Sequence, residues 1–200
     1  MLGQNGMSYE VLEEAAKSIK GVSGLTCEIG LREGGGTKLI IDSLISVNDF
    51  NRTHICIDPF GHLPYPLNET QIVTYDYTNH MRNQAMWELY AYIDDKKINV
   101  LFFPLEDFEF FNRFADGVPV YEDSKRMMNQ YALVYFDGPH TLAITMNETE
   151  FFEPRAPKGA IFVYDDIHDY YDHSKIKEYL TALGWEEIIA TNHKASYRKQ

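Results

Sequence analysis

Short apolar runs recur along the chain, and longer segments with a helical spacing of apolar positions separate them. The runs are rich in β-branched and aromatic residues and are bounded by Gly, Pro or Asp, which is typical of strands buried on both faces of a sheet. We predict such strands at Leu25–Ile29, Thr53–Ile57, 98–103, 131–137 and 159–166. Helices are predicted at 8–19, 38–47, 81–93 and 174–183, and one crossover helix is expected within 141–158. Because parallel strands need such crossovers, the alternation predicts a doubly wound α/β fold with a mostly parallel sheet and helices on both faces.

The C-terminal part of the pattern is different. Trp185–Ala190 and Ala195–Lys199 are short strands joined by a turn-rich link, so we expect a hairpin that closes one edge of the sheet. We find no internal repeat and no interdomain linker, and we therefore predict a single domain over residues 1–200.

Two segments are predicted to be irregular. Residues 61–80 contain Pro64, Pro66 and several Tyr, and this length for a connection suggests a lid or acceptor-binding loop, or otherwise a surface insertion. Residues 108–114 are expected to turn helical. The polar segment that follows is read as a connection with some helix at 124–130.

Composition limits the classes of partner. Hydrophobic residues make up 44% and charged residues 24% of the 200 residues, which is ordinary for a globular protein. The net charge of −12 disfavours a nucleic-acid partner, because such partners are bound by clustered Lys and Arg. We see no apolar run of membrane-spanning length and no secretory signal, so we expect a cytoplasmic protein without a membrane partner. Cys27 and Cys56 are expected to be free core thiols.

Acidic residues end the last two predicted parallel strands. Asp137 ends the first of these runs, and Asp165 and Asp166 end the second. If the strands are neighbours, these side chains lie side by side at the carboxyl edge, where open α/β sheets bind ligands. Carboxylates gathered there repel one another unless something positive lies between them, and a hard divalent cation is the simplest candidate. The alternative is that each Asp only caps a turn.

A glycine-rich turn connects the first predicted strand to the next helix. It begins at Glu28 and Gly30 and continues through glycines 34–36. Glycines let the backbone approach a ligand closely, and the start of the helix points its N–H groups at the same place. Asp58 then ends the second strand. This arrangement indicates a nucleoside site, with the carboxylate accepting hydrogen bonds from ribose hydroxyls.

Motifs in this order resemble those of class I S-adenosylmethionine-dependent methyltransferases, and most closely the macrocin and novobiocin type of small-molecule O-methyltransferase. The motifs are EIG with glycines 34–36, DPFGHLP at 58–64, FDGPH at 136–140 and YDDI at 164–167. The resemblance runs from about residue 25 to residue 169. In the second motif the Gly comes one place early and Pro stands in the place of Ser.

The resemblance implies a seven-stranded sheet with an antiparallel last strand and with S-adenosylmethionine over the first and fourth strands. Glu28 would lie near the methionine amine, Asp58 near the ribose, and Glu106 or Asp107 near the adenine. The cofactor-binding residues that it implies are Glu28, Gly30, Gly34, Gly35, Asp58, Phe60, Glu106, Asp107 and Asp137. The residues that it implies for Mg²⁺ are Asp137, Asp165 and Asp166.

Methyl transfer to a hydroxyl group needs a base that removes the proton. His140 follows Asp137 by three residues, a spacing that places both side chains on one side of a first helical turn. We therefore predict His140 as the general base, Asp137 as the second catalytic residue, and His168 as the rival base. The aromatic candidates for an acceptor pocket are Tyr75, Tyr77, Tyr170 and Tyr171.

Taken together, these features predict a Mg²⁺-dependent O-methyltransferase that acts on a hydroxyl of a small molecule, such as a sugar or a phenol. Two alternatives remain open. One is a methyltransferase that uses the same cofactor without a metal, and the other is a catalytically silent domain that only binds S-adenosylmethionine or a nucleoside. The sequence also leaves open whether copies of the chain form a homo-oligomer.

Overall fold

A mixed sheet forms the centre of the structure, a computed structural model that describes residues 2–3, 6–68, 70–168 and 170–200. The sheet has seven strands in the order β10-β11-β9-β8-β1-β2-β5. They are β1 (Leu25–Ile29), β2 (Thr53–Ile57), β5 (Asn99–Phe103), β8 (Tyr131–Phe136), β9 (Ile161–Tyr164), β10 (Trp185–Ala190) and β11 (Ala195–Lys199). Only β11 runs antiparallel to its neighbours. The seven strands, the antiparallel last strand and the C-terminal hairpin are confirmed.

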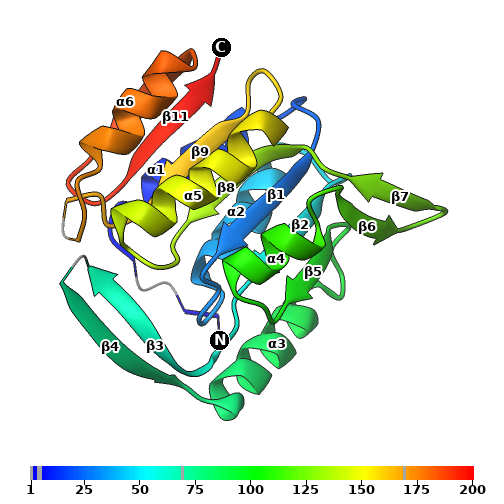
Figure 1. Ribbon diagram of the computed structural model, residues 1–200. Coiled ribbons are helices and arrows are strands. Elements are labelled where there is room, and N and C mark those ends of the chain that lie inside the picture. The colour runs from blue at the N-terminus through cyan, green and yellow to red at the C-terminus, as the bar shows by residue number, and fades with distance from the viewer. Residues whose placement is uncertain (1, 4–5, 69, 169) are drawn as a thin grey trace.

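Helices cover both faces of the sheet (Figure 1). One face carries α1 (Tyr9–Ser18), α2 (Gly35–Ser46) and α3 (Asn79–Ile93). The other carries α4 (Asp107–Arg113), α5 (Leu142–Phe152) with the short 3₁₀ turn η1 (Glu153–Arg155), and α6 (Ser174–Ala182). Because both faces are covered, every residue of β1, β2, β8 and β9 is buried, which explains their continuous apolar runs. Among the described residues, no helix has the length and apolar character that a membrane crossing requires.

A hairpin replaces the irregular loop that the sequence predicts at 61–80. β3 (Gly61–Asn68) and β4 (Gln71–Tyr77) pair antiparallel and stand apart from the main sheet (Figure 1). Pro64 and Pro66 are compatible with β3 because both strands of a two-stranded ribbon are edge strands, which tolerate a missing N–H. The prediction of a loop failed because the prolines and polar residues hid the strand pairing.

The prediction of helix at 124–130 is also wrong. β6 (Val118–Tyr121) and β7 (Lys125–Met128) form a second antiparallel hairpin, in which the N–H of Glu122 donates to the carbonyl of Ser124 at 3.3 Å. Pairing with β6 overrides the weak local preference of this polar segment. The helical turn expected at 108–114 is confirmed as α4.

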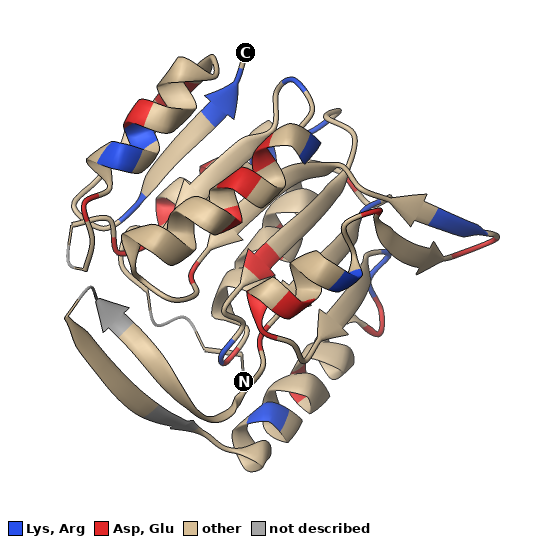
Figure 2. Ribbon diagram, in the orientation of Figure 1, with Lys and Arg blue, Asp and Glu red and all other residues tan. Residues whose placement is uncertain are grey.

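The carboxyl ends of four parallel strands meet at one edge of the sheet. Ile29 of β1 pairs with both Ile57 of β2 and Phe136 of β8, and Phe136 pairs in turn with Tyr164 of β9. The residues that directly follow these four strand ends are Gly30, Asp58, Asp137 and Asp165, and they lie in a row. Figure 2 shows further acidic residues around the end of β1 and the start of α4, beside this edge.

Candidate functional site

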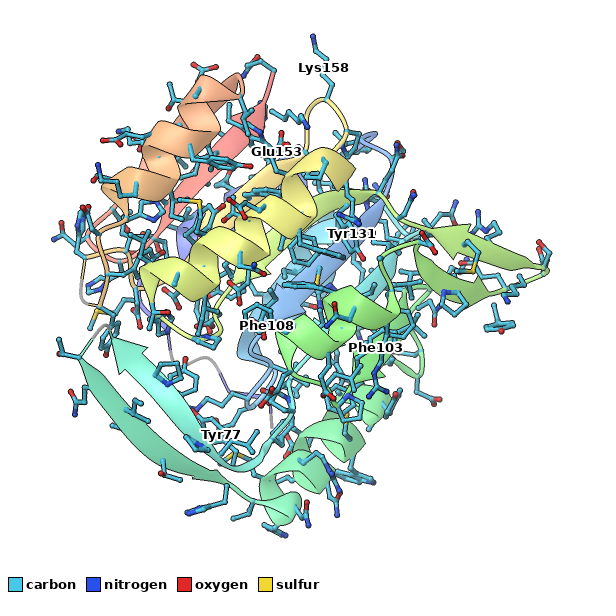
Figure 3. All side chains as sticks on the ribbon, in the orientation of Figure 1. Tyr77, Phe103, Phe108, Tyr131, Glu153 and Lys158 are labelled. Carbon is cyan, nitrogen blue, oxygen red and sulfur yellow. The ribbon has the colours of Figure 1, made fainter. Side chains whose placement is uncertain are left out.

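A cavity of about 570 Å³ opens at the carboxyl edge of the sheet, and the β3–β4 hairpin borders it. Tyr77 from β4 and Phe108 from α4, both labelled in Figure 3, line it together with the segments that follow β1, β2, β8 and β9. Every cofactor-binding residue that the sequence predicts lines this cavity except Gly34. Gly34 is instead the residue before α2, with a φ of 76° that glycine adopts without strain.

Two glycines are required where the turn after β1 meets its neighbours. A Cβ atom at Gly30, whose φ is 87°, would lie 2.1 Å from the carbonyl oxygen of Asp137. A Cβ atom at Gly36 would lie 2.1 Å from Oε1 of Glu28. No side chain fits at either distance, so the turn passes this close to the end of β8, and the start of α2 this close to Glu28, only because these positions are glycine. Backbone therefore forms this part of the cavity wall.

The carboxyl group of Glu28 belongs to a buried network centred on the hydroxyl of Thr37. That hydroxyl donates to Oε2 of Glu28 and lies 2.9 Å from Nε2 of His54 and 3.2 Å from Sγ of Cys56. Burial raises the pKa of Glu28 to about 8 and lowers the pKa of His54 to about 3, so His54 is neutral near pH 7.

Glu28, His54 and Cys56 also form the one trio among the described residues whose ligand atoms all lie within 4.8 Å of one another. Because the hydroxyl of Thr37 already contacts all three, we interpret the trio as a hydrogen-bond network rather than a metal site. The sequence predicts neither the network nor the part of Thr37 in it. The expectation that Cys27 and Cys56 are free buried thiols is confirmed.

Asp58 joins the glycine turn to the segment after β2. Its Oδ2 accepts a hydrogen bond from the N–H of Arg32, and its Oδ1 accepts one from the N–H of Phe60, both at 2.8 Å. Arg32 and Phe60 have φ values of 46° and 52°, a left-handed conformation that these two hydrogen bonds help to hold. Burial raises the pKa of Asp58 above 3.8. Asp58 lines the cavity, and its contact with a ribose stays a prediction.

Asp107 and Glu148 form a buried carboxyl pair beside the start of α4. Asp107 lines the cavity, whereas Glu148 belongs to α5 and is 1% exposed. Among the described residues, no hydrogen-bond partner is found for Oδ2 of Asp107 or Oε1 of Glu148. Burial, and then the charge of Asp107, raise the pKa of Glu148 well above its ordinary value. The protonated form of Glu148 is therefore favoured. Sequence reasoning missed Glu148 because a helical Glu is normally exposed.

Asp137 and Asp165 meet at the ends of β8 and β9, where the parallel register brings them together. Each of the two carboxyl groups shifts the pKa of the other. Burial, and then the charge of Asp165, raise the pKa of Asp137 well above 3.8. A proton on Asp137 therefore relieves part of the repulsion between the two groups.

A lysine that the sequence analysis did not single out supplies the positive charge beside this pair. Lys194 lies in the link between β10 and β11, and its Nζ donates to Oδ1 of Asp165 and, at 3.0 Å, to the hydroxyl of Tyr135. That hydroxyl donates in turn to Oδ2 of Asp165 at 2.9 Å. Although burial alone raises the pKa of Asp165, the charge and hydrogen bond of Lys194 outweigh burial and hold this pKa below 3.8.

Asp166, the third residue that the resemblance assigns to Mg²⁺, is turned towards His140. Its backbone is left-handed, with a φ of 50°, and its Oδ2 lies 3.5 Å from Nε2 of His140. Within the described part of the chain, Asp137, Asp165 and Asp166 do not bring one ligand atom each to within 4.8 Å of one another. With Lys194 on Asp165 as well, this arrangement does not fit a divalent ion held by all three.

His140 lies at the cavity, and the rival base His168 does not. The ring of His140 stacks on that of Tyr170, with 5.2 Å between centroids and 18° between planes, and both residues line the cavity. His168 is exposed and is not among the described residues that line the cavity. A carboxylate beside an imidazole orients the ring and stabilises its protonated form, so Asp166 and His140 form a dyad suited to accept a proton.

The aromatic residues at the cavity differ in part from those expected. Tyr77 and Tyr170 line it, but Tyr171 lies in the core, where its hydroxyl is 3.2 Å from Nδ1 of His173. The side chain of Tyr75 lies outside the described residues. Tyr65 of β3 was not among the candidates, yet it lines the cavity and donates a hydrogen bond to the carbonyl of Gly138.

The fold has counterparts among solved methyltransferase structures. The O-methyltransferase NovP is 17% identical with a TM-score of 0.62, and the match covers 96% of this chain and 78% of that chain. The calicheamicin methyltransferase CalS11 is 16% identical with a TM-score of 0.63, over 96% of this chain and 77% of that chain. An O-methyltransferase from Bacillus cereus, in complex with SAH, is 9% identical with a TM-score of 0.58, over 98% of this chain and 84% of that chain. No protein-family model and no curated protein sequence matches the chain. The protein therefore has the Rossmann-like fold of methyltransferases.

Proposed function

We propose that the protein is an S-adenosylmethionine-dependent O-methyltransferase that acts on a hydroxyl group of a small molecule. The observation that carries this proposal is the cavity in which the glycine turn, Asp58, Asp107 and His140 line one space. Solved structures with the same fold support it, since several are described as O-methyltransferases. CalS11 is described as a TDP-rhamnose 3′-O-methyltransferase, which is a reason to test sugar hydroxyls as acceptors.

The residues present fit S-adenosylmethionine. Gly30 and Gly36 leave no room for a side chain, so the wall at the start of α2 offers backbone N–H groups to a ligand. A cationic amine placed beside the buried carboxyl group of Glu28 would lower the pKa of that group and favour its ionised form. Asp58 would accept hydrogen bonds from the ribose hydroxyls and Asp107 from the adenine amine. When bound, S-adenosylmethionine supplies the methyl group.

His140 would remove the proton from the acceptor hydroxyl. The ring of Tyr170 and the carboxylate of Asp166 hold its imidazole at the cavity, and Asp166 would stabilise the imidazolium formed when the proton arrives. Asp137 borders the same cavity and would orient the acceptor by a hydrogen bond. Enclosure by the β3–β4 hairpin would limit the access of water to the transferring methyl group.

Calorimetric titration of S-adenosylhomocysteine tests the cofactor half of the proposal. Asp58→Ala should weaken binding by at least about tenfold, since it removes a charge-assisted hydrogen-bond acceptor. Asp95→Ala is the matched control, because Asp95 is an exposed acid paired with Lys96 at the end of α3. An absence of binding at millimolar concentration would refute the proposal.

Transfer of a labelled methyl group to a panel of sugar nucleotides and phenols tests the catalytic half. Turnover on a member of this panel supports the O-methyltransferase. Cofactor binding without turnover of any member of the panel would favour the catalytically silent domain. Such a domain would bind S-adenosylmethionine in the same cavity but would not transfer the methyl group.

A further inference from the structure

Lys194 is fully enclosed next to the candidate site. Its side chain is 0% exposed, and its Nζ lies 5.1 Å from the ring centroid of Tyr9 and 5.3 Å from that of Tyr135. The polar partners of Nζ are Oδ1 of Asp165 and the hydroxyl of Tyr135. Aromatic rings and a carboxylate together make a complete environment for a buried ammonium group.

The backbone of the β10–β11 link directs this side chain inward. The N–H of Lys194 donates to Oγ1 of Thr191 at 2.9 Å, and the N–H of Thr191 donates to the carbonyl of Lys194 at 2.8 Å. These hydrogen bonds fix the backbone of the link at Lys194, whose side chain is fully buried. Removing either partner would leave the other charge buried and unpaired, which is costly in free energy. The ion pair between Lys194 and Asp165 therefore matters for the stability of the fold, unlike an exposed surface ion pair.

Both oxygens of Asp165 are occupied by groups of the protein. Lys194 takes Oδ1 and the hydroxyl of Tyr135 takes Oδ2. Asp137 and Asp165 follow paired ends of the neighbouring strands β8 and β9, and Oδ2 of Asp166 lies 3.5 Å from Nε2 of His140. A divalent cation needs several oxygen ligands that converge on it, and here both oxygens of Asp165 and Oδ2 of Asp166 already contact groups of the protein.

We infer that the ammonium group of Lys194 holds the place of a divalent cation beside Asp137 and Asp165. The acidic cluster therefore binds no divalent cation, and methyl transfer proceeds without one. The statement about transfer rests on the proposed function, whereas the statement about cation binding does not. Lys194 is a positioning residue, because it touches Asp165 and is not among the described residues that line the cavity.

Binding of Mn²⁺, followed through the loss of the EPR signal of the free ion, tests the inference without cofactor or acceptor. The wild type should show only weak, non-saturating binding. Lys194→Met should bind Mn²⁺ at least about tenfold more tightly, because it exposes the carboxylates of Asp165 and Asp137 to the ion. Mn²⁺ should also raise the melting temperature of this variant alone. Lys194→Met combined with Asp165→Asn should return to weak binding.

Lys199→Met is the matched control for the loss of a lysine. Lys199 belongs to β11 and pairs with Glu153 at 2.8 Å, and it is not among the described residues at the cavity. Its variant should bind Mn²⁺ as the wild type does. If Lys194→Met does not fold, Mn²⁺ binding is compared between the wild type and Asp165→Asn instead. Equally weak binding of Mn²⁺ by these two proteins would support the inference.

Saturable binding of Mn²⁺ by the wild type that Asp165→Asn removes would overturn the inference. A folded Lys194→Met protein that binds Mn²⁺ no more tightly than the wild type would overturn it as well. Failure of the proposed function is a separate result, because it would appear as absent S-adenosylhomocysteine binding or turnover and would leave the Mn²⁺ data unchanged. Where turnover is found, it should persist in excess EDTA, and loss of turnover that Mg²⁺ restores would refute the metal-free reaction.

Discussion

The hydroxyl of Tyr65 donates a hydrogen bond to the carbonyl oxygen of Gly138, and this bond joins the β3–β4 hairpin to the segment that follows β8. Gly138 is two residues before His140, and all three residues line the cavity. The hairpin is therefore fastened next to the residue that we propose as the base. Its position over the cavity depends on a contact with the site itself.

Tyr65→Phe should loosen the hairpin and leave the sheet intact. The variant loses one hydroxyl and keeps the ring, so the free energy of unfolding should fall by about 1 kcal/mol or less. Amide hydrogen exchange should become faster in 61–77 because local opening becomes easier, while exchange in β1 and β8 stays unchanged. Tyr90→Phe, at a half-exposed position of α3, is the control. Unchanged exchange in 61–77 would mean that the bond does not hold the hairpin.

Glu28→Gln should change how stability depends on pH. Burial raises the pKa of Glu28 from 4.5 to about 8. The folded protein therefore keeps a proton that the unfolded chain loses above about pH 4.5, so the free energy of unfolding falls as the pH rises to about 8 and then levels off. Gln cannot ionise, so the free energy of unfolding of Glu28→Gln does not have this pH dependence. Relative to the wild type, it should increase between about pH 4.5 and pH 8 by an amount on the order of a few kcal/mol.

Urea unfolding of both proteins at pH 5, 6, 7 and 8 measures this difference. Glu14→Gln serves as the control, because Glu14 lies on the exposed face of α1. A difference in stability between wild type and Glu28→Gln that stays constant from pH 5 to pH 8 would show that Glu28 is ionised throughout in the folded protein.

The parts of the site that follow directly from strand register could be predicted from the sequence. Asp58, Asp137 and Asp165 each follow a buried parallel strand, and neighbouring parallel strands bring such residues to one edge. Gly30 was predictable for a related reason, since a turn that must pass a neighbouring strand closely needs glycine.

Other parts depend on contacts between distant segments and left no local signal. Lys194 follows Thr191, Asn192 and His193 in a polar link, and lysines in such links are normally exposed. Its burial needs Tyr9 of α1, Tyr135 of β8 and Asp165 after β9, which are far apart in the sequence. The β3–β4 hairpin was hidden for another reason, because local preference counts prolines as strand breakers while an isolated ribbon accepts them.

Arg52→Lys should destabilise the protein strongly although Arg52 is remote from the cavity. The guanidinium of Arg52 is buried and donates to the carbonyls of Ile19, Val22 and Gly24 at 2.9, 2.6 and 2.9 Å. The single ammonium of lysine cannot reach all three, so carbonyls between α1 and β1 lose their donors. The expected loss is about 2–4 kcal/mol in the free energy of unfolding. Arg126→Lys, at an exposed position, should change it by less than about 0.5 kcal/mol. Equal effects of the two variants in urea unfolding would contradict this account.

His140→Gln should reduce turnover and leave cofactor binding unchanged. Gln can keep a hydrogen bond to Asp166 but cannot accept a proton, so kcat should fall by about 10²–10⁴-fold. The dissociation constant of S-adenosylhomocysteine should stay within about twofold, because the predicted cofactor contacts lie elsewhere in the cavity. Asp166→Asn should give a smaller loss of kcat, since it removes the charge behind His140 and leaves the imidazole in place.

His168→Gln is the matched control, because His168 is an exposed histidine close in sequence to Asp166. Steady-state kinetics with an acceptor that the wild type methylates measure these effects. A wild-type kcat for His140→Gln would contradict the assignment of the base. An equal loss of kcat in His168→Gln and His140→Gln would contradict it as well.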